Sequence, residues 1–213
     1  MTYLSCENNQ LTSLDVSNNT ALMDLICYRN SISYISIANN EYLLLAYKTG
    51  ENNYRNPEPP KSAIEYVWWG VYPHEFIVDR TTRIFTESVE LKHGWNQLDG
   101  TWSFLKNDSF VTGWLEDSGC WYYFDSLGIM QTGWQQINGA WFYLETSGVM
   151  VTGWKQINGS WYYLESSGAM KTGWYLSGSS WYYLDDSGEM VTGSKTIGGK
   201  TYNFNSNGVC TNP

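Results

Sequence analysis

A motif of twenty residues recurs along the second half of the chain and constrains its fold more than any other feature. The stretch from Gly153 to Thr172 reads GWKQINGSWYYLESSGAMKT. Further copies, complete or degenerate, begin at Gly94, Gly113, Gly133, Gly173 and Gly193. A fixed period of this length predicts a solenoid, in which each unit buries its apolar face against its neighbours.

Each unit carries the signals of a β-hairpin followed by a loop. The aromatic run at 161–164 is typical of a strand. The Asn-Gly pair at 158–159 suits a tight turn, because both residues tolerate positive φ. Side chains alternate along a strand, so Trp161 and Tyr163 are predicted on one face and Tyr162 on the other.

The charge and hydropathy of the chain exclude two kinds of partner. The net charge is −9, with 11 acidic and 7 basic residues before Gly94 and 10 and 5 from there on. Because there is no basic patch, we expect no nucleic-acid partner. No apolar run approaches the roughly 18 residues of a membrane span. The first residues also lack the basic and apolar regions of a signal peptide.

A second period, of 21 residues, occupies the first 46 positions. The apolar residues of 4–16 recur in 25–37, together with one cysteine and one asparagine per copy. This spacing resembles the leucine-rich repeats of bacterial surface proteins, in which an asparagine satisfies turn backbone after a short strand. The resemblance implies a segment that binds a protein partner.

The leucine-rich ladder is predicted to end after two coils. A third coil would need apolar residues at 46 and 48 and an asparagine at 51, where the chain has Ala46, Lys48 and Glu51. Since a solenoid needs about three or more units plus caps, we expect Met1 to be an artificial start. Further coils and a secretion signal are then expected upstream. A native start with a very short leucine-rich segment is the alternative.

Residues 47–93 match neither repeat. The proline-rich stretch at 56–60 is typical of a stiff linker. Strand-like runs follow at 65–69, 75–79 and 84–87, and they predict a β-cap that covers the coils and docks the hairpin repeats. A ligand site at Trp68 and Trp69 is the alternative, although adjacent strand aromatics face opposite ways.

Catalytic and metal-binding chemistry finds no support in the sequence. His74 and His93 are the two histidines, and neither belongs to a nucleophile motif. One carboxylate recurs after each aromatic run, which indicates a role in turns, since a general acid and base pair would occur once. These carboxylates are Asp125, Glu145, Glu165 and Asp185. We expect no enzymatic activity, no metal and no cofactor.

The four cysteines, Cys6, Cys27, Cys120 and Cys210, form no CxxC motif and no Cys/His cluster. Cys6 and Cys27 take the same position in neighbouring coils. They are predicted to be buried thiols, and a disulfide between them is the alternative.

Three aromatic rings recur in each full hairpin unit. A tryptophan follows the first glycine, a second opens the aromatic run, and a tyrosine follows two residues later. A hairpin solenoid must bury some rings, and we assign the aromatic after the second tryptophan to that core. The remaining density exceeds what packing requires and suits the binding of cations or the stacking of sugars.

The full motif, Gly-Trp-x6-Trp-Tyr-Tyr-Leu-x3-Gly-x-Met-x-Thr-Gly-Trp, resembles the choline-binding, or cell-wall-binding, repeat of Gram-positive surface proteins over residues 94 to about 210. The resemblance implies a β-solenoid of hairpins. Choline would sit between consecutive hairpins, in a cage of two tryptophans from one unit and a tyrosine from the next. A quaternary ammonium donates no hydrogen bond and is held by ring quadrupoles.

Three complete cages are implied: Trp114, Trp121 and Tyr143; Trp134, Trp141 and Tyr163; Trp154, Trp161 and Tyr183. Two imperfect cages are Trp95, Trp102 and Tyr123, and Trp174, Trp181 and Phe204. The last unit has Ser194 and Tyr202 where the two tryptophans are expected, and it should act as a cap.

These patterns predict a mainly β protein with a leucine-rich segment at 1–46, a linker and β-cap at 47–93, and a hairpin solenoid at 94–213. The predicted protein is secreted and non-catalytic, and is held at a Gram-positive cell surface by choline-bearing teichoic acid. The related glucan-binding repeats favour Tyr and Phe over paired tryptophans. Glucan binding, and a stalk without a ligand, are the alternatives.

Overall fold

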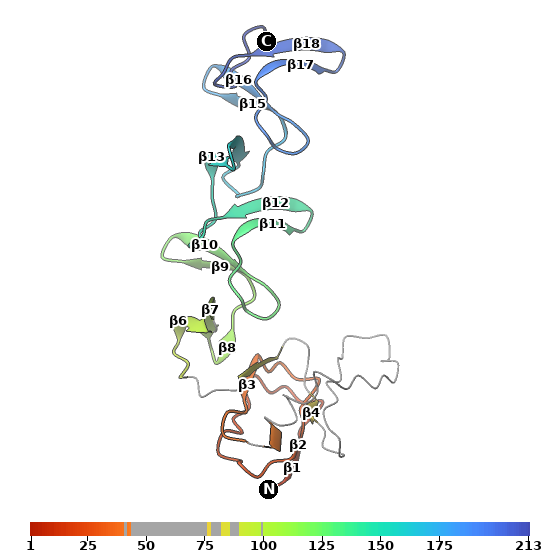
Figure 1. Cartoon of the computed structure of the whole chain (residues 1–213), viewed down its shortest axis with the longest axis vertical. Coiled ribbons are helices and arrows are strands. Elements are labelled where there is room, and N and C mark those ends of the chain that lie inside the picture. Colours follow the sequence, from red (N-terminus) through yellow and green to blue (C-terminus); the bar gives the residue numbers. More distant parts are fainter. Residues whose placement is uncertain (41, 44–75, 78–81, 86–89, 99) are drawn as a thin grey trace. The chain divides into compact units, whose positions relative to one another are not determined.

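The structure, a computed structural model, describes residues 1–40, 42–43, 76–77, 82–85, 90–98 and 100–213. Short strands and tight turns dominate these residues (Figure 1), which confirms the predicted mainly β fold with repeated hairpins. Helices long and apolar enough to cross a membrane are absent from the described residues. The predictions for residues 56–60, Trp68, Trp69 and His74 lie outside the described residues.

The chain divides into two compact units. The N-terminal unit comprises Met1–Gly113 and Phe124–Met130, and the C-terminal unit comprises Trp114–Tyr123 and Gln131–Pro213. Each unit is described by itself, and the segment boundaries expected after residues 46 and 93 stay predictions.

Parallel coils begin the N-terminal unit. Strands β1 (Tyr3–Ser5) and β2 (Asp24–Ile26) pair in parallel, with Leu4 opposite Leu25. Strand β3 (Tyr34–Ser36) lies on the return arm of the second coil. The apolar residues of both coils form one buried cluster around Leu25, Ile35 and Ile37, each fully buried. The register confirms the period of 21 residues predicted from the sequence.

The asparagines of the two coils make the backbone hydrogen bonds expected of them. Asn30 donates from Nδ2 to the carbonyl oxygens of Cys6 (3.0 Å) and Cys27 (2.9 Å), and its Oδ1 accepts from the Leu11 N–H (3.1 Å). Asn9 donates to the Cys6 carbonyl at 2.9 Å. The Asn30 side chain thus satisfies backbone groups of two neighbouring coils. Buried backbone groups need such partners, because leaving them without a hydrogen bond is costly.

Two strands from the region predicted as a β-cap continue the parallel pairing of the coils. Strand β4 (Phe76–Ile77) pairs in parallel with β2, and β5 (Arg83–Phe85) pairs in parallel with β3. Thr82 Oγ1 also donates to the Ile32 carbonyl at 2.9 Å. The sequence argument searched one period ahead, whereas Phe76 lies 51 positions after its partner Leu25. The four cysteines are free thiols, and Cys27 and Cys210 are buried.

The first hairpin belongs to the N-terminal unit. Strands β6 (Gly94–Leu98), β7 (Thr101–Lys106) and β8 (Ser109–Phe110) form an antiparallel sheet. Phe110 packs against Tyr34 (ring centroids 5.5 Å apart) and Phe85 (6.4 Å), and its N–H donates to Ser33 Oγ at 3.2 Å. A second buried cluster therefore joins this hairpin to the coils.

Five further hairpins follow with the same plan. Their strands are β9 (Gly113–Asp117), β10 (Cys120–Phe124), β11 (Gly133–Ile137), β12 (Ala140–Leu144), β13 (Gly153–Ile157), β14 (Ser160–Leu164), β15 (Gly173–Ser177), β16 (Ser180–Leu184), β17 (Gly193–Ile197) and β18 (Lys200–Phe204). The two-residue turn between β13 and β14 has φ of 51° at Asn158 and 93° at Gly159, as the Asn-Gly pair predicts.

Each loop ties its own hairpin to the preceding one. Met150 bridges to Leu144 of its own hairpin, and its N–H donates to the Trp121 carbonyl at 2.8 Å. The equivalent bonds join Met170 to Trp141 (2.7 Å), Met190 to Trp161 (2.8 Å) and Cys210 to Trp181 (2.8 Å). Consecutive repeats are therefore continuous in hydrogen bonding as well as in packing.

Gly168 is required at its place in this junction for two reasons. Its φ is +85°, and a Cβ there would lie 2.3 Å from the Sδ of Met150. Leu164, which closes the same hairpin, is fully buried. The glycine lets the loop approach the methionine of the preceding repeat.

Candidate aromatic binding sites

Every hairpin except the last, β17–β18, gathers three aromatic rings on one face. Trp134 lies opposite Tyr143 in the register, and Trp141 stands two residues before Tyr143 on the same face. The Trp134 ring meets Trp141 at 6.4 Å and 88°, and Tyr143 at 5.2 Å and 67°. The two indoles thus stand at right angles to each other. Strand alternation predicts the shared face of the second tryptophan and the tyrosine, and the family resemblance implies the pairing of the two tryptophans.

The same arrangement recurs along the chain. Ring contacts join Trp95 to Trp102 (6.3 Å), Trp114 to Trp121 (6.4 Å) and Trp174 to Trp181 (6.1 Å). In the hairpin of Trp154 and Trp161, Trp154 contacts Tyr163 at 5.3 Å.

The second tryptophan of every pair is exposed. The exposed fractions are 41% for Trp102, 42% for Trp121, 41% for Trp141, 41% for Trp161 and 38% for Trp181. The first tryptophan of each pair is only half-buried. A single exposed indole needs no explanation, but one repeated at the same place in five hairpins forms a recurring apolar surface.

The ring at the second position of the aromatic run in one hairpin contacts the first tryptophan of the preceding hairpin. The contacts are Trp114 with Phe142 (5.0 Å), Trp134 with Tyr162 (5.0 Å), Trp154 with Tyr182 (4.9 Å) and Trp174 with Tyr202 (4.8 Å). The sequence analysis assigned this second-position ring to the core and missed its place beside the tryptophan pair. Strand alternation puts the second-position ring on the face opposite to the tryptophans of its own hairpin. That face meets the tryptophans of the preceding hairpin when the hairpins stack.

The third-position tyrosines, which the sequence placed in the cage of the preceding hairpin, contact the tryptophan of their own hairpin. Tyr123 lies 5.0 Å from Trp114, Tyr143 5.2 Å from Trp134, Tyr163 5.3 Å from Trp154 and Tyr183 5.2 Å from Trp174. Trp95 and Trp102 belong to the N-terminal unit, in which Trp95 contacts Phe104 (5.3 Å) and Phe124 (5.7 Å), whereas Tyr123 belongs to the C-terminal unit.

The last hairpin corrects the alignment of Tyr202. Thr196 pairs with Thr201, which puts Thr201 and not Tyr202 at the place of the second tryptophan. Tyr202 is the second-position ring that contacts Trp174. Phe204 takes the buried place of Leu184, at 4% exposure, and lies 5.9 Å from Trp174. The alignment of this hairpin from the sequence was therefore wrong by one residue, and the strand register corrects it.

Polar groups cover the face of this hairpin where the others carry rings. Ser194 Oγ donates to Asn203 Oδ1 at 2.7 Å, and the hydroxyls of Thr196 and Thr201 lie 3.1 Å apart. A polar outer face is what a terminal repeat needs.

Turn formation explains the two aspartates among the recurring carboxylates, as predicted. Asp125 Oδ1 accepts from the N–H groups of Leu127 and Ile129, both at 2.9 Å. Asp185 accepts from the N–H groups of Ser187 (2.9 Å) and Glu189 (3.1 Å). Partial burial acts to raise the pKa of Asp185, but these hydrogen bonds and Lys195 prevail and lower it.

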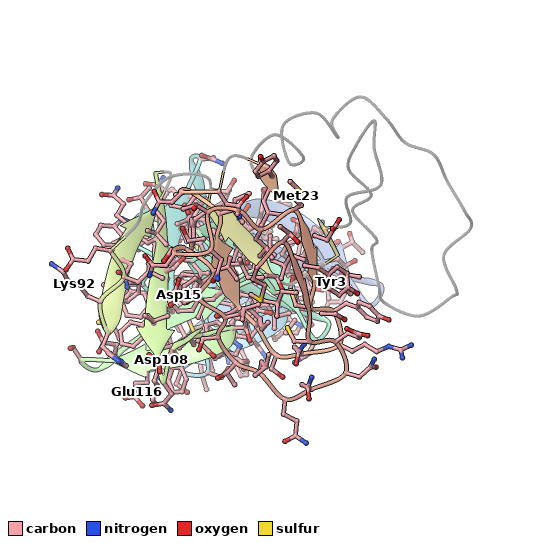
Figure 2. All side chains as sticks on the ribbon, turned by 90° about the horizontal axis from the view of Figure 1, so that it is seen from below. Tyr3, Asp15, Met23, Lys92, Asp108 and Glu116 are labelled. Atoms are coloured by element: carbon pink, nitrogen blue, oxygen red, sulfur yellow. The ribbon has the colours of Figure 1, made fainter. Side chains whose placement is uncertain are left out.

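Ion pairs occupy the two glutamates of the same series. Glu145 pairs with Lys155, and Glu165 lies 3.7 Å from the Nζ of Lys171. The four carboxylates thus take part in turns or in ion pairs. His93 forms an exposed pair with Asp108 at 3.7 Å (Asp108 is labelled in Figure 2). Groups of three or more metal-ligating side chains do not occur among the described residues.

One junction between hairpins differs from the others. Tyr175 stands where its sister hairpins carry Leu115, Gln135, Lys155 and Lys195. Its ring stacks on Tyr163 at 3.9 Å and 27°, and lies 5.9 Å from Trp154. The hydrogen bond to Tyr175, together with burial, raises the pKa of Tyr163.

A second side-chain bond spans two hairpins. The Tyr162 hydroxyl donates to Glu189 Oε1 at 3.0 Å. Burial first, and then Glu189, raise the pKa of Tyr162, so the phenol stays protonated and remains a donor.

Comparison with known proteins follows this geometry. The family model of the choline-binding repeat matches residues 111–152 and 151–193. The crystal structure of choline binding protein F from Streptococcus pneumoniae, in the presence of a peptidoglycan analogue, is 44% identical over 57% of this chain and 42% of that one, with a TM-score of 0.56. A second crystal form is 43% identical over 57% and 43%, with a TM-score of 0.55.

The same protein in complex with ipratropium is 40% identical over 57% of this chain and 44% of that one, with a TM-score of 0.55. This chain thus spans less than half the length of these structures. No curated protein matches it. Residues 111–193 thus match the choline-binding repeat in sequence, and the hairpins are similar to those of choline binding protein F.

Proposed function

We propose that the paired tryptophans bind the quaternary ammonium of choline and hold the protein non-covalently on a choline-bearing wall polymer such as teichoic acid. The observation that carries this proposal is the repeated pair of indoles at right angles, one half-buried and one exposed. Ring faces attract a cation that donates no hydrogen bonds.

The third wall of each site comes from the following hairpin. Tyr162 already contacts Trp134 and is the better placed candidate for the Trp134 and Trp141 site. Tyr163, the ring implied by the family resemblance, remains the second candidate. The corresponding proposal holds for the sites of Trp114 and Trp121, Trp154 and Trp161, and Trp174 and Trp181.

Several weak sites are enough for anchoring. Cation–π contacts contribute about 0.5–2 kcal/mol each, and part of that is lost to the entropy of binding. A net of about −4 kcal/mol corresponds to roughly millimolar affinity. Sites in series on a polymer with many choline groups gain a factor on the order of 10²–10⁴ through effective concentration.

The test is retention on choline-substituted resin against dextran resin. We expect the full chain to bind the choline resin and to elute with free choline at about millimolar concentration, because each site alone is weak. Retention on dextran that resists choline would replace this proposal with glucan binding. Retention on neither resin would favour a stalk without a ligand.

We further propose that the N-terminal coils are of the leucine-rich type and bind a protein partner. The parallel ladder and the bonds of Asn30 to two coils support this type. Asn30→Ala should destabilise the N-terminal unit by roughly 1–3 kcal/mol, because buried carbonyls lose their donor. Choline retention should be largely kept, since the tryptophan pairs from Trp114 to Trp181 belong to the C-terminal unit.

The chain is proposed to act at a Gram-positive cell surface without catalysis. The carboxylates of the repeats serve turns and ion pairs, which supports this. Purified protein should hydrolyse neither peptidoglycan nor glucan. Turnover that disappears in His74→Ala would contradict the proposal.

A further inference from the structure

Lys200 opens strand β18 at a position where the other hairpins carry small residues. The equivalent residues are Cys120, Ala140, Ser160 and Ser180. The Lys200 side chain is exposed, and its Nζ lies 4.7 Å from the centroid of the Tyr202 ring. This distance is a cation–π contact within the chain.

The ring under this ammonium belongs to the last aromatic site. Tyr202 contacts Trp174 at 4.8 Å, and Trp174 pairs with Trp181 at 6.1 Å. Lys200 and Tyr202 alternate with Thr201 along β18, so both side chains leave the strand on one face. A cation of the protein therefore already lies on one wall of this site.

Among the described residues, Lys200 has no acidic partner. Lys195 stands opposite Tyr202 in the register, but its charge faces the Asp185 carboxylate, which it stabilises. Lys155, the counterpart of Lys195, is paired with Glu145. In the part of the chain that the structure describes, no salt bridge involves Lys200.

We propose that Lys200 is a specificity-determining residue of the Trp174 and Trp181 site. This inference rests on the proposed binding of choline. The ammonium occupies a ring that a free quaternary cation would use, and it repels that cation. A phosphocholine group is not disfavoured in the same way, because its phosphate brings a negative charge next to Lys200. The last site therefore selects phosphate-linked choline over free choline, and the sister sites do not.

The size of the discrimination follows from Coulomb's law. Two like charges about 6 Å apart at the water-exposed edge of a protein change an affinity by about threefold to tenfold. Salt reduces the effect, since the Debye length is about 10 Å at 0.1 M. We therefore expect the difference between sites to shrink as sodium chloride is raised.

Site-resolved titration tests the proposal on the full chain. The indole N–H signals of the protein labelled with ¹⁵N-tryptophan are assigned with single Trp→Phe variants and followed against choline and against phosphocholine. In the wild type, the signals of Trp174 and Trp181 should need about threefold to tenfold more choline than those of Trp134 and Trp141. With phosphocholine the difference should disappear.

Two variants at this position and one at a sister position provide the controls. Lys200→Ser, which installs the residue of the sister hairpins, should bring the choline curve of the last site onto the others. Lys200→Arg keeps the charge and should leave the curve where it is. Ser180→Lys places an ammonium beside Tyr182 and should weaken choline binding at Trp154 and Trp161.

The outcomes separate the two proposals. If choline shifts every pair at the same concentration and Lys200→Ser changes nothing, the role of Lys200 is wrong and the proposed function stands. If choline shifts none of the indole signals, the proposed function fails, and this inference fails with it. If Lys200→Arg behaves like Lys200→Ser, the charge is not the cause and the inference is overturned.

Discussion

Tyr163 and Tyr175 stack across the junction between hairpins β13–β14 and β15–β16, with centroids 3.9 Å apart. The equivalent junctions place Gln135, Lys155 or Lys195 where Tyr175 stands. Of these junctions, this one adds an aromatic pair to the packing that all repeats share.

Removing this stack should lower the stability of the C-terminal unit. Tyr175→Gln, which installs the residue found at 135, should destabilise by about 0.5–1.5 kcal/mol beyond the loss of buried area, the usual worth of an aromatic pair. Urea unfolding followed by fluorescence measures the change. Tyr175→Phe keeps the stack and should lose less. Equal stability of wild type and Tyr175→Gln would show that the stack contributes nothing.

Gly168→Ala should be clearly destabilising, because the new methyl group meets Met150 Sδ at 2.3 Å and the backbone has φ of +85°. The backbone term costs about 1–2 kcal/mol, and overpacking typically adds 1–3 kcal/mol. Gly159→Ala is the matched control, since its φ is +93° and nothing lies within 4 Å. Thermal unfolding should rank Gly168→Ala well below Gly159→Ala, and equal losses would mean that Met150 moves aside freely.

Asp185→Asn should lose only the charge-dependent part of the stabilisation at pH 7, whereas Asp185→Ala should also cost roughly 0.5–1.5 kcal/mol for each lost hydrogen bond. Asn205 shows why the amide suffices, since its Oδ1 accepts from the N–H groups of Asn207 (2.9 Å) and Val209 (3.0 Å) in the equivalent turn. Urea midpoints of the three proteins at pH 7 test the ranking.

Acid should reveal the charge of Asp185. Its pKa is lowered from 3.8 in the folded chain. The stabilisation from this turn is therefore present above pH 3.8 and is lost as the pH falls through the lower folded value. Asp185→Asn should flatten this part of the acid unfolding curve. An unchanged acid limb in the variant would contradict the assignment.

Anchoring should decline in steps as tryptophans are removed. Trp154→Ala should weaken retention on choline resin without abolishing it, because the other sites persist. Removal of Trp134, Trp154 and Trp174 together should abolish retention. Circular dichroism must show that the triple variant folds. If it folds and still binds like the wild type, the tryptophans do not form the sites.

Replacing Tyr162 or Tyr163 by leucine tests which tyrosine forms the third wall of the Trp134 and Trp141 site. Tyr162→Leu should weaken choline binding at Trp134 and Trp141, because its ring already contacts Trp134 at 5.0 Å. Tyr163→Leu should act mainly on Trp154, which it contacts at 5.3 Å. Indole N–H titrations distinguish the two, and the reverse pattern would favour Tyr163 as the third wall.

Local signals in the sequence predicted the hairpins well. The Asn158-Gly159 turn, the alternation of Trp161 with Tyr163 and the turn role of Asp185 all depend on residues within one repeat. Strand alternation fixes the face that each ring presents along one strand, whereas the pairing of Trp134 with Trp141 was implied by the family resemblance.

Features that join distant residues were harder to predict. The contact of Trp134 with Tyr162 depends on how one hairpin stacks on the next, which the period alone does not define. The pairing of Leu25 with Phe76 interrupts the period of 21 residues with a long insertion. Lys200 beside Tyr202 is a departure from the repeat, and comparison with Ser160 and Ser180 would have exposed it.

The 51 positions between Leu25 and Phe76 also separate the chain into parts that form at different speeds. A hairpin such as β13–β14 closes between residues at most 11 positions apart, from Gly153 to Leu164. Loop closure grows costlier with length, and contacts between distant residues slow folding. The hairpins can therefore nucleate locally within microseconds to milliseconds. The third rung of the parallel ladder must wait for the search that brings β4 back to β2, so we expect it to form after the hairpins.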